Sequence, residues 1–321
     1  MARLERISGP RQCGEGPHWD APTQRLLSVD IPGQDVYRWD ERRCVEEKLH
    51  IDFKNDASNP HACQTSLVVP IESQPDTYAI STGRALSVLE WSGGKHTVRD
   101  FVQVDDHRPT NRFNDGKCDP QGNLWAGSMG LQTSEPGSLP PGAGALYYIS
   151  PEGAATRVLD GVTCSNGLAW NSSGDRMYYI DTFSYKVDVF DCDLTGPSIG
   201  NRRTVYDVKQ KGAGGFPDGM TIDTSGNIWV AMYFASMVAC IDPERGQVVQ
   251  QLHLPASNIT SCTWGGPGHD VLYVTSALHG LEPWQLAVQP GAGCTYRVTG
   301  LGARGAPNVP WRAELAALPR A

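Results

Sequence analysis

The chain has 321 residues, of which 35 are acidic and 27 basic, and its formal net charge is −8. This acidic balance gives the protein no electrostatic attraction to nucleic acid, so we expect no nucleic-acid partner. Its residues are 40% hydrophobic but are interrupted by 35 Gly and 23 Pro, with no apolar run long enough to cross a bilayer, so we expect a globular protein without a membrane span.

The N-terminal stretch at residues 1–16, MARLERISGPRQCGEG, has neither the continuous apolar segment nor the small-residue cleavage site of a secretory signal. Nine cysteines are scattered along the chain without a CxxC pair, which argues against a zinc site or a redox dithiol. We therefore expect a cytoplasmic protein whose cysteines are mostly reduced and buried.

One pattern then recurs along the chain: a polar residue, a glycine, two apolar residues, a turn and an apolar strand. It occurs at residues 14–31, 114–129, 165–182 and 217–233. The glycines of these segments are 100, 51 and 52 residues apart, at Gly16, Gly116, Gly167 and Gly219. A period of about fifty residues follows if the first interval holds two units. Less regular units at 61–83 and 261–277 then bring the number of units to six.

Each unit contains short runs rich in Val, Ile, Leu, Tyr and Trp, joined by turn sequences such as DPQGN and DTSGN. Strand repeats of this length are typical of propeller blades. We therefore predict an all-β protein, a six-bladed β-propeller of four-stranded antiparallel blades, with residues 1–321 forming a single domain. Residues 294–305 are expected to supply strands that close the ring beside the N-terminal segment. A β-sandwich or a β-helix is the alternative fold.

The residue before each repeat glycine carries a side-chain oxygen: Glu15, Asp115, Asn166 and Asp218. Equivalent positions of different blades meet around the central channel, so we expect these four side chains to converge. Carboxylate and amide oxygens are the ligands of hard cations, and a divalent ion would relieve the repulsion among the carboxylates. The alternative is that Asp-Gly and Asn-Gly here are ordinary surface turns.

The sequences of these segments resemble those of the family of regucalcin, gluconolactonase and luciferin-regenerating enzyme, a group of six-bladed propellers. The motifs that carry the resemblance are CGEGPHW, NRFNDGKCDPQGNLWAGSM, SNGLAW, MYYIDTFSYKVDVFDCD, FPDGMTIDTSGNIWVA and GHDVLYVTSA. They occur in the family's order and cover nearly the whole chain. The resemblance implies a divalent-metal site formed by Glu15, Asn166 and Asp218, with Asn114 close by. Ca²⁺ is the expected ion, and Zn²⁺, Mn²⁺ or Mg²⁺ also suits such a set.

The resemblance also implies a substrate site beside the metal. Arg112 and Asn114 match positions that hold substrate oxygens, and Asp115 lies in the same motif. The chain departs from the regucalcin pattern at Gln132, where a substrate-contacting Glu is expected. A neutral amide there replaces a carboxylate that would accept hydrogen bonds from sugar hydroxyls, so the family's sugar-lactone specificity does not carry over directly.

The function that follows is metal-assisted hydrolysis of a small-molecule lactone by a monomeric enzyme. The metal would polarise the ester carbonyl, Asp218 or Asp115 would take a proton from the attacking water, and Arg112 would orient the substrate. The alternatives are a luciferin-regenerating or other specialised role within the same family, and a non-catalytic calcium-binding protein.

Two catalytic motifs match by chance. GLGARG at 300–305 fits GxGxxG, but no βαβ unit surrounds it, which argues against dinucleotide binding. GPSIG at 196–200 fits GxSxG, but its Pro and its polar flanks indicate a hairpin turn and not a nucleophile elbow. Of the eight histidines, His18 alone is expected near the channel, as a packed imidazole with satisfied hydrogen bonds.

Overall fold

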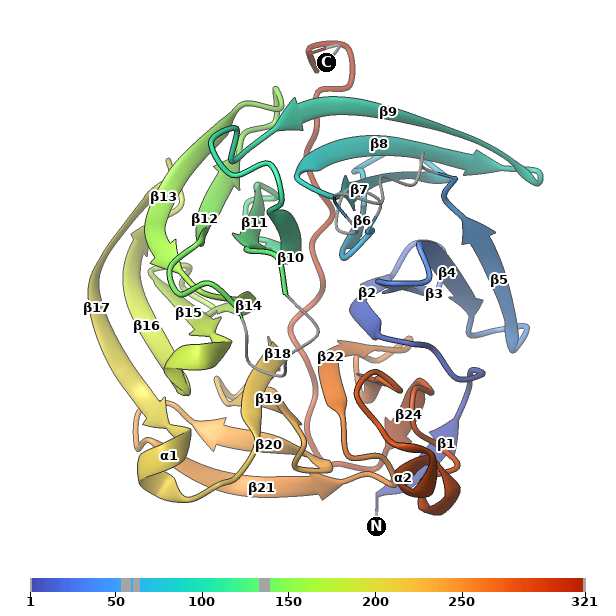
Figure 1. The fold of residues 1–321 in the computed structure, drawn as a ribbon, viewed down its shortest axis with the longest axis vertical. Helices are drawn as coiled ribbons and strands as arrows, with labels where there is room; N and C mark the ends of the chain where they lie inside the picture. Colours follow the sequence, from blue (N-terminus) through green and yellow to red (C-terminus); the bar gives the residue numbers. More distant parts are fainter. Residues whose placement is uncertain (1, 53–58, 60–63, 133–138, 320–321) are drawn as a thin grey trace.

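Six four-stranded antiparallel sheets surround a central channel (Figure 1). The structure is a computed structural model and describes residues 2–52, 59, 64–132 and 139–319. This architecture confirms the predicted six-bladed β-propeller, and the β-sandwich and β-helix alternatives are wrong. The predicted unit at 61–83 contributes strands to the second blade, although its first residues, 61–63, lie outside the described part of the chain.

The blades follow the chain order from the innermost strand outward. The first blade contains β2 (Gly14–Asp20), β3 (Arg25–Asp30), β4 (Asp35–Asp40) and β5 (Val45–His50). The second contains β6 (Val68–Pro70), β7 (Thr77–Thr82), β8 (Ala85–Ser92) and β9 (Lys95–Gln103). The third contains β10 (Arg112–Cys118), β11 (Leu124–Met129), β12 (Gly144–Ile149) and β13 (Ala155–Val162).

The remaining blades have the same arrangement. The fourth contains β14 (Ser165–Trp170), β15 (Arg176–Asp181), β16 (Lys186–Asp193) and β17 (Ser198–Asp207). The fifth contains β18 (Phe216–Ile222), β19 (Ile228–Tyr233), β20 (Met237–Asp242) and β21 (Gln247–His253). The sixth contains β22 (Ile259–Gly265), β23 (Val271–Ser276), β24 (Tyr296–Thr299) and β1 (Arg3–Arg6).

The helical elements are short. They are the 3₁₀ turn η1 (Thr182–Ser184) and the helices α1 (Val208–Lys211) and α2 (Pro283–Val288). No helix in the described part of the chain is long and apolar enough to span a bilayer.

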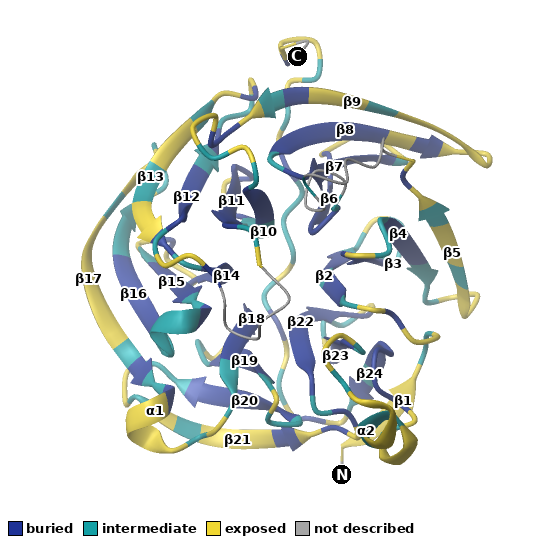
Figure 2. Ribbon diagram, viewed as in Figure 1, coloured by how far each residue is buried: buried dark blue, intermediate teal, exposed yellow. Residues whose placement is uncertain are grey.

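Burial decreases from the hub to the edge of each blade (Figure 2). Every residue of the inner strands β14 and β22 is buried, whereas most of the outer strands β5 and β17 is exposed. Inner strands are covered on both faces by neighbouring blades, so even their polar residues, such as Asn166 on β14, are buried. Outer strands lie at the solvent edge, and their charged side chains protect that edge from pairing with other molecules.

The repeated turn sequence has a structural cause. In blade three, Asp119 Oδ1 accepts hydrogen bonds from the Gln121 and Asn123 amides at 2.9 and 3.0 Å, and Asp119 Oδ2 accepts from the Trp125 indole at 3.0 Å. Blade five repeats this arrangement with Asp223 and Trp229, again at 3.0 Å. One carboxylate therefore closes the turn and satisfies the N–H of a fully buried tryptophan, which explains why the same residues recur about a hundred positions apart.

The ring closes between the two ends of the chain. β24 pairs antiparallel with β1, so the predicted closure by residues 294–305 beside the N-terminal segment is confirmed for β24. After β24, residues 305–311 run across the channel end where the inner strands finish, and we call them the C-terminal strap (Figure 1). The strap bridges to Asp223 through Gly305 and to Ile71 through Trp311.

Candidate metal centre

A cavity of about 580 Å³ lies at the opposite channel end, where the inner strands begin. Its wall includes most of the side chains expected at the site: Glu15, Arg112, Asn114, Gln132, Asn166 and Asp218. Asp115 is the exception, since it lines a separate small cavity next to Gly16, His18 and Lys117. A further cavity, of about 530 Å³, lies beside the C-terminal strap and contains none of the expected residues.

Bulges in the inner strands aim these side chains. Pairing with the second strand shifts register between Glu15 and His18, between Ser165 and Leu168, and between Pro217 and Met220. A bulge re-aims side chains locally, and here it falls at the polar-glycine position of blades one, four and five.

In the third blade the shift falls between Phe113 and Asp115, which leaves Asn114 unpaired and puts Asp115 back in the regular ladder opposite Gly127. The bulge therefore comes one residue earlier than the repeat suggests. This offset accounts for Asn114 lining the large cavity while Asp115 does not.

The repeat glycines serve the contact between blades. A Cβ on Gly167 would lie 2.8 Å from the Asp218 carbonyl oxygen, and one on Gly219 would lie 2.0 Å from Ser261 Oγ. Both neighbours belong to the inner strand of the next blade. The glycines thus allow inner strands to approach closely and bring Asn166 and Asp218 together.

Glu15 and Asp218 form a buried pair of carboxyl groups. Burial raises the pKa of Glu15 well above its ordinary value, and the charges of Asp218 and Asp115 raise it further. Burial also raises the pKa of Asp218 well above its ordinary value, with an added contribution from Asp115, while the Asn166 side chain and the Gly219 amide oppose the rise. Two such groups in one cavity favour a bound cation.

Asn166 supplies a free oxygen beside these carboxyl groups. Its Nδ2 donates to Thr182 Oγ1 at 2.9 Å, and Thr182 Oγ1 in turn donates to the Pro217 carbonyl at 3.0 Å. This chain fixes the amide and leaves Asn166 Oδ1 buried without a hydrogen-bond partner in the described structure. A buried amide oxygen without a partner is costly, and a cation would satisfy it.

The donor set fits a hard divalent cation. Two carboxylates and one amide oxygen are oxygen ligands, and water or substrate would complete the coordination. No three His, Cys, Asp or Glu side chains of the described residues are grouped to hold a metal, so the set depends on the Asn166 amide. The cavity also contains the thiols of Cys13 and Cys164, and burial raises the pKa of both, that of Cys164 to about 12. Sulfur is a soft ligand and suits a hard cation less well than the oxygens of Glu15, Asn166 and Asp218.

Arg112 and Asn114 form one unit on the cavity wall. Arg112 Nη1 donates to Asn114 Oδ1 at 2.7 Å and to the Phe113 carbonyl at 2.9 Å, and Asn114 Nδ2 donates to the Ser165 carbonyl at 2.8 Å. Asn114 is thus occupied in holding Arg112. Arg112 Nε is buried without a partner in the described structure, which leaves this N–H available to a ligand. Burial lowers the pKa of Arg112.

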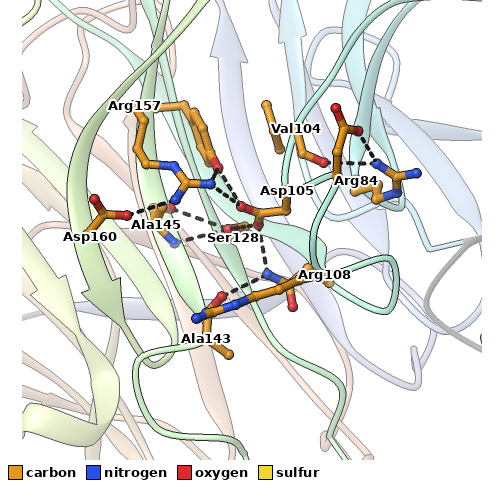
Figure 3. Close-up of polar contacts among 12 residues, drawn as sticks. Arg84, Val104, Asp105, Arg108, Ser128, Ala143, Ala145, Arg157 and Asp160 are labelled. Carbon is orange, nitrogen blue, oxygen red and sulfur yellow. Dashed lines mark hydrogen bonds and ion pairs between the residues drawn. The ribbon is translucent and has the colours of Figure 1, made fainter.

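A polar network holds Asn111, the residue before Arg112, and Figure 3 shows its members Asp105, Ser128 and Arg157. Its centre is the buried carboxylate of Asp105. That carboxylate accepts from Asn111 Nδ2 at 2.7 Å, Ser128 Oγ at 2.6 Å, the Tyr147 hydroxyl at 2.5 Å and Arg157 at 3.0 Å. Because Asn111 directly precedes Arg112, the network fixes the point at which β10 enters the cavity. The sequence analysis missed it, since its members lie far apart in the chain.

The small cavity behind the site holds Asp115, His18 and Lys117. Burial raises the pKa of Asp115, and the Lys117 ammonium partly offsets that rise. Lys117 Nζ donates to the Met220 carbonyl at 2.6 Å. Burial, with a smaller contribution from Lys117, lowers the pKa of His18 to about 3, so the imidazole is neutral near pH 7.

The sequence did not predict that aromatic side chains lie at the cavity mouth. Phe183, Phe216, Tyr233 and Phe234 line the cavity together with Ile31, Met129 and Leu139. No periodicity distinguishes such residues from core positions. Of the nine cysteines, the eight in the described part of the chain are all free and five of them are buried, while Cys63 lies outside the described residues.

Comparison with known proteins places these observations in a family. Residues 13–278 match the model of the SMP-30/Gluconolactonase/LRE-like region. The chain is 38% identical over 310 residues to regucalcin of Gallus gallus, covering 96% of this chain and 98% of that protein.

The fold of this chain also matches those of solved structures. A luciferin-regenerating enzyme superposes with a TM-score of 0.88 at 31% identity, covering 97% of this chain and 100% of its own. A calcium-binding protein, regucalcin, from Agrobacterium tumefaciens superposes with a TM-score of 0.83 over 96% of both chains, and at 23% identity it supports the fold alone.

Proposed function

The chain belongs to the SMP-30/gluconolactonase/LRE-like family, and from that premise we propose that it is a divalent-metal-dependent hydrolase of small-molecule lactones. The observation that carries the proposal is the cavity in which the buried carboxyl groups of Glu15 and Asp218 lie with the unpartnered Oδ1 of Asn166. These three side chains are the proposed metal ligands. A bound Ca²⁺, or Zn²⁺, Mn²⁺ or Mg²⁺ in its place, would supply Lewis acidity to the ester carbonyl.

The side chains of the cavity provide the remaining functions. Arg112 Nε donates a hydrogen bond to a substrate oxygen and orients the lactone, while Asn114 holds the guanidinium in place. Asp218 would accept the proton of the attacking water through one of its carboxylate oxygens. Water adds to the acyl carbon, the ring C–O bond breaks, and the departing alkoxide receives the proton, which yields the hydroxy acid.

Asp115 acts indirectly in this mechanism. It lies outside the cavity, so it cannot touch the substrate, but its charge raises the pKa of both Glu15 and Asp218. We assign it an electrostatic role, and we assign proton transfer to Asp218 alone. Gln132, exposed at the mouth, can contact substrate through its amide.

A lactonase assay with metal exchange tests the proposal. Protein stripped with a chelator is assayed on a panel of lactones before and after addition of Ca²⁺, Mn²⁺, Zn²⁺ or Mg²⁺. We expect turnover to be lost on stripping and restored by at least one ion. Metal binding without turnover of any lactone would favour the non-catalytic calcium-binding alternative, and turnover unaffected by stripping would contradict the metal-dependent mechanism.

A further inference from the structure

The mouth of the site cavity carries a cluster of five aromatic side chains from blades four and five, which we call the aromatic rim: Phe183, Tyr185, Phe216, Tyr233 and Phe234. Phe216 is at its centre, with ring centroids 5.7 Å from Phe183, 4.8 Å from Tyr185 and 6.1 Å from Phe234. Tyr233 contacts Phe234 at 4.6 Å. All but Tyr185 line the cavity.

Core packing explains only part of the rim, because Phe183 and Tyr185 alone pack against buried clusters in the described structure. Phe234 is 54% exposed, so its ring adds little to the hydrophobic core. Its backbone is in the left-handed region with φ of 67°, and that of Tyr185 has φ of 60°. A bulky side chain is an outlier there and costs about 1 kcal/mol or more, whereas Gly or Asn at the same turn costs less. For Phe234, which lines the cavity, the strained backbone together with the exposed ring points to a role in binding.

The rim offers few hydrogen bonds to a ligand. Its phenyl rings have no polar atoms, and the Tyr233 hydroxyl donates to the His279 carbonyl at 3.1 Å and accepts from Asn258 Nδ2 at 3.2 Å. Ile31, Met129 and Leu139 also line the cavity, and Phe183 packs against the cluster that contains Met129 and Leu139. A polyhydroxylated sugar ring would lose hydrogen bonds to water here without replacing them.

We propose that the aromatic rim binds an apolar, ring-bearing substituent of the lactone, so that this protein prefers aryl- or alkyl-substituted lactones to sugar lactones. The inference rests on the proposed function and concerns the substrate class of the same site. The reacting ester lies at the Glu15, Asn166 and Asp218 end of the cavity, and the substituent packs on Phe216 and Phe234.

Three lactones test the substrate class: δ-valerolactone, the same ring carrying a phenyl group beside the ring oxygen, and glucono-δ-lactone. We expect kcat/KM for the phenyl lactone to exceed that for δ-valerolactone by about tenfold, mainly through KM. Equal values, or a preference for glucono-δ-lactone, would overturn the inference.

Phe234→Gly and Phe216→Ala locate the effect. Phe234→Gly relieves the left-handed strain, so its fold and melting temperature should be preserved. Both variants should lose most of the phenyl preference, measured as the ratio of kcat/KM for the phenyl lactone to kcat/KM for δ-valerolactone. Val249→Ala, at an exposed position on β21, serves as the control.

Failure of the proposed function gives a different result. If no lactone is turned over, calorimetric binding of the phenyl lactone to wild type and to Phe234→Gly still tests the rim. Binding weakened by the substitution supports the rim as an apolar subsite, and equal or absent binding overturns it.

Discussion

At the scale of single residues, the site depends on polar groups that the fold buries without fully satisfying. Asn166 Oδ1 and Arg112 Nε have no hydrogen-bond partners among the described residues. The carboxyl groups of Glu15 and Asp218 are both buried, and the charge of Asp218 raises the pKa of Glu15. Each of these groups costs stability in the absence of a ligand. Because these buried polar groups line the same cavity, we infer that the protein keeps them, despite the loss of stability, in order to bind a ligand.

Asp218→Asn should weaken metal binding about a hundredfold or more, because it removes a charged ligand while keeping the shape of the side chain. Lactonase activity should fall with it. Titration calorimetry with Ca²⁺ measures the first effect, and Asp242→Asn on β20 of the same blade is the matched control. Wild-type affinity and activity in Asp218→Asn would refute the assignment of this residue.

Thr182→Val should weaken metal binding about tenfold, since loss of the hydroxyl frees the Asn166 amide to rotate. The substitution preserves volume, and Thr97→Val on the exposed strand β9 controls for the exchange itself. An unchanged calcium affinity would mean that the Asn166 orientation does not depend on Thr182.

His18 should make the fold sensitive to acid. Its pKa is about 3 in the folded protein and about 6.5 when unfolded, so below pH 6.5 the unfolded chain takes up a proton that the folded chain does not. Stability therefore falls as pH falls, by about 2 kcal/mol at pH 5 from this residue. His18→Gln should remove that part of the slope in denaturant unfolding between pH 7 and pH 5, and parallel curves for variant and wild type would contradict it.

At the scale of elements, the bulges and glycines of the inner strands explain what the sequence could and could not predict. The repeat predicted Glu15, Asn166 and Asp218 on one cavity because these residues occupy equivalent bulged positions. Asp115 was misplaced by the same logic, since a one-residue offset of the bulge in β10 cannot be read from a repeat. The aromatic rim comes from turns and strand ends, where apolar residues carry no periodic signal.

The C-terminal strap is an element without a sequence pattern, and its anchor should be Trp311. This side chain is fully buried and stacks on Phe101 of β9 with ring centroids 5.1 Å apart. Trp311→Ala should lower the free energy of unfolding by about 3–5 kcal/mol. Urea unfolding measures the loss against Leu4→Ala at an exposed position of β1, and equal stabilities would show that the strap does not hold blades two and five.

At the scale of the whole molecule, the fold was predictable because the blades repeat the same turn and the same arrangement of strands. Turn carboxylates such as Asp119 and Asp223 recur with their tryptophans, and inner strands such as β14 are buried along their whole length. Closure of the ring by β1 and β24 followed from the chain ends. The Asp105 network and the strap were not predictable, because their contacts join residues distant in sequence and follow no repeat.

The central claim is that Glu15, Asn166 and Asp218 bind one divalent cation at the hub of the propeller. Anomalous diffraction from crystals grown with Mn²⁺, compared with Ca²⁺-grown crystals, tests it most directly. We predict a single strong peak in the site cavity, with oxygens of all three side chains about 2.1–2.6 Å from the ion. A peak that is absent, or one that lies away from these three oxygens, would contradict the account.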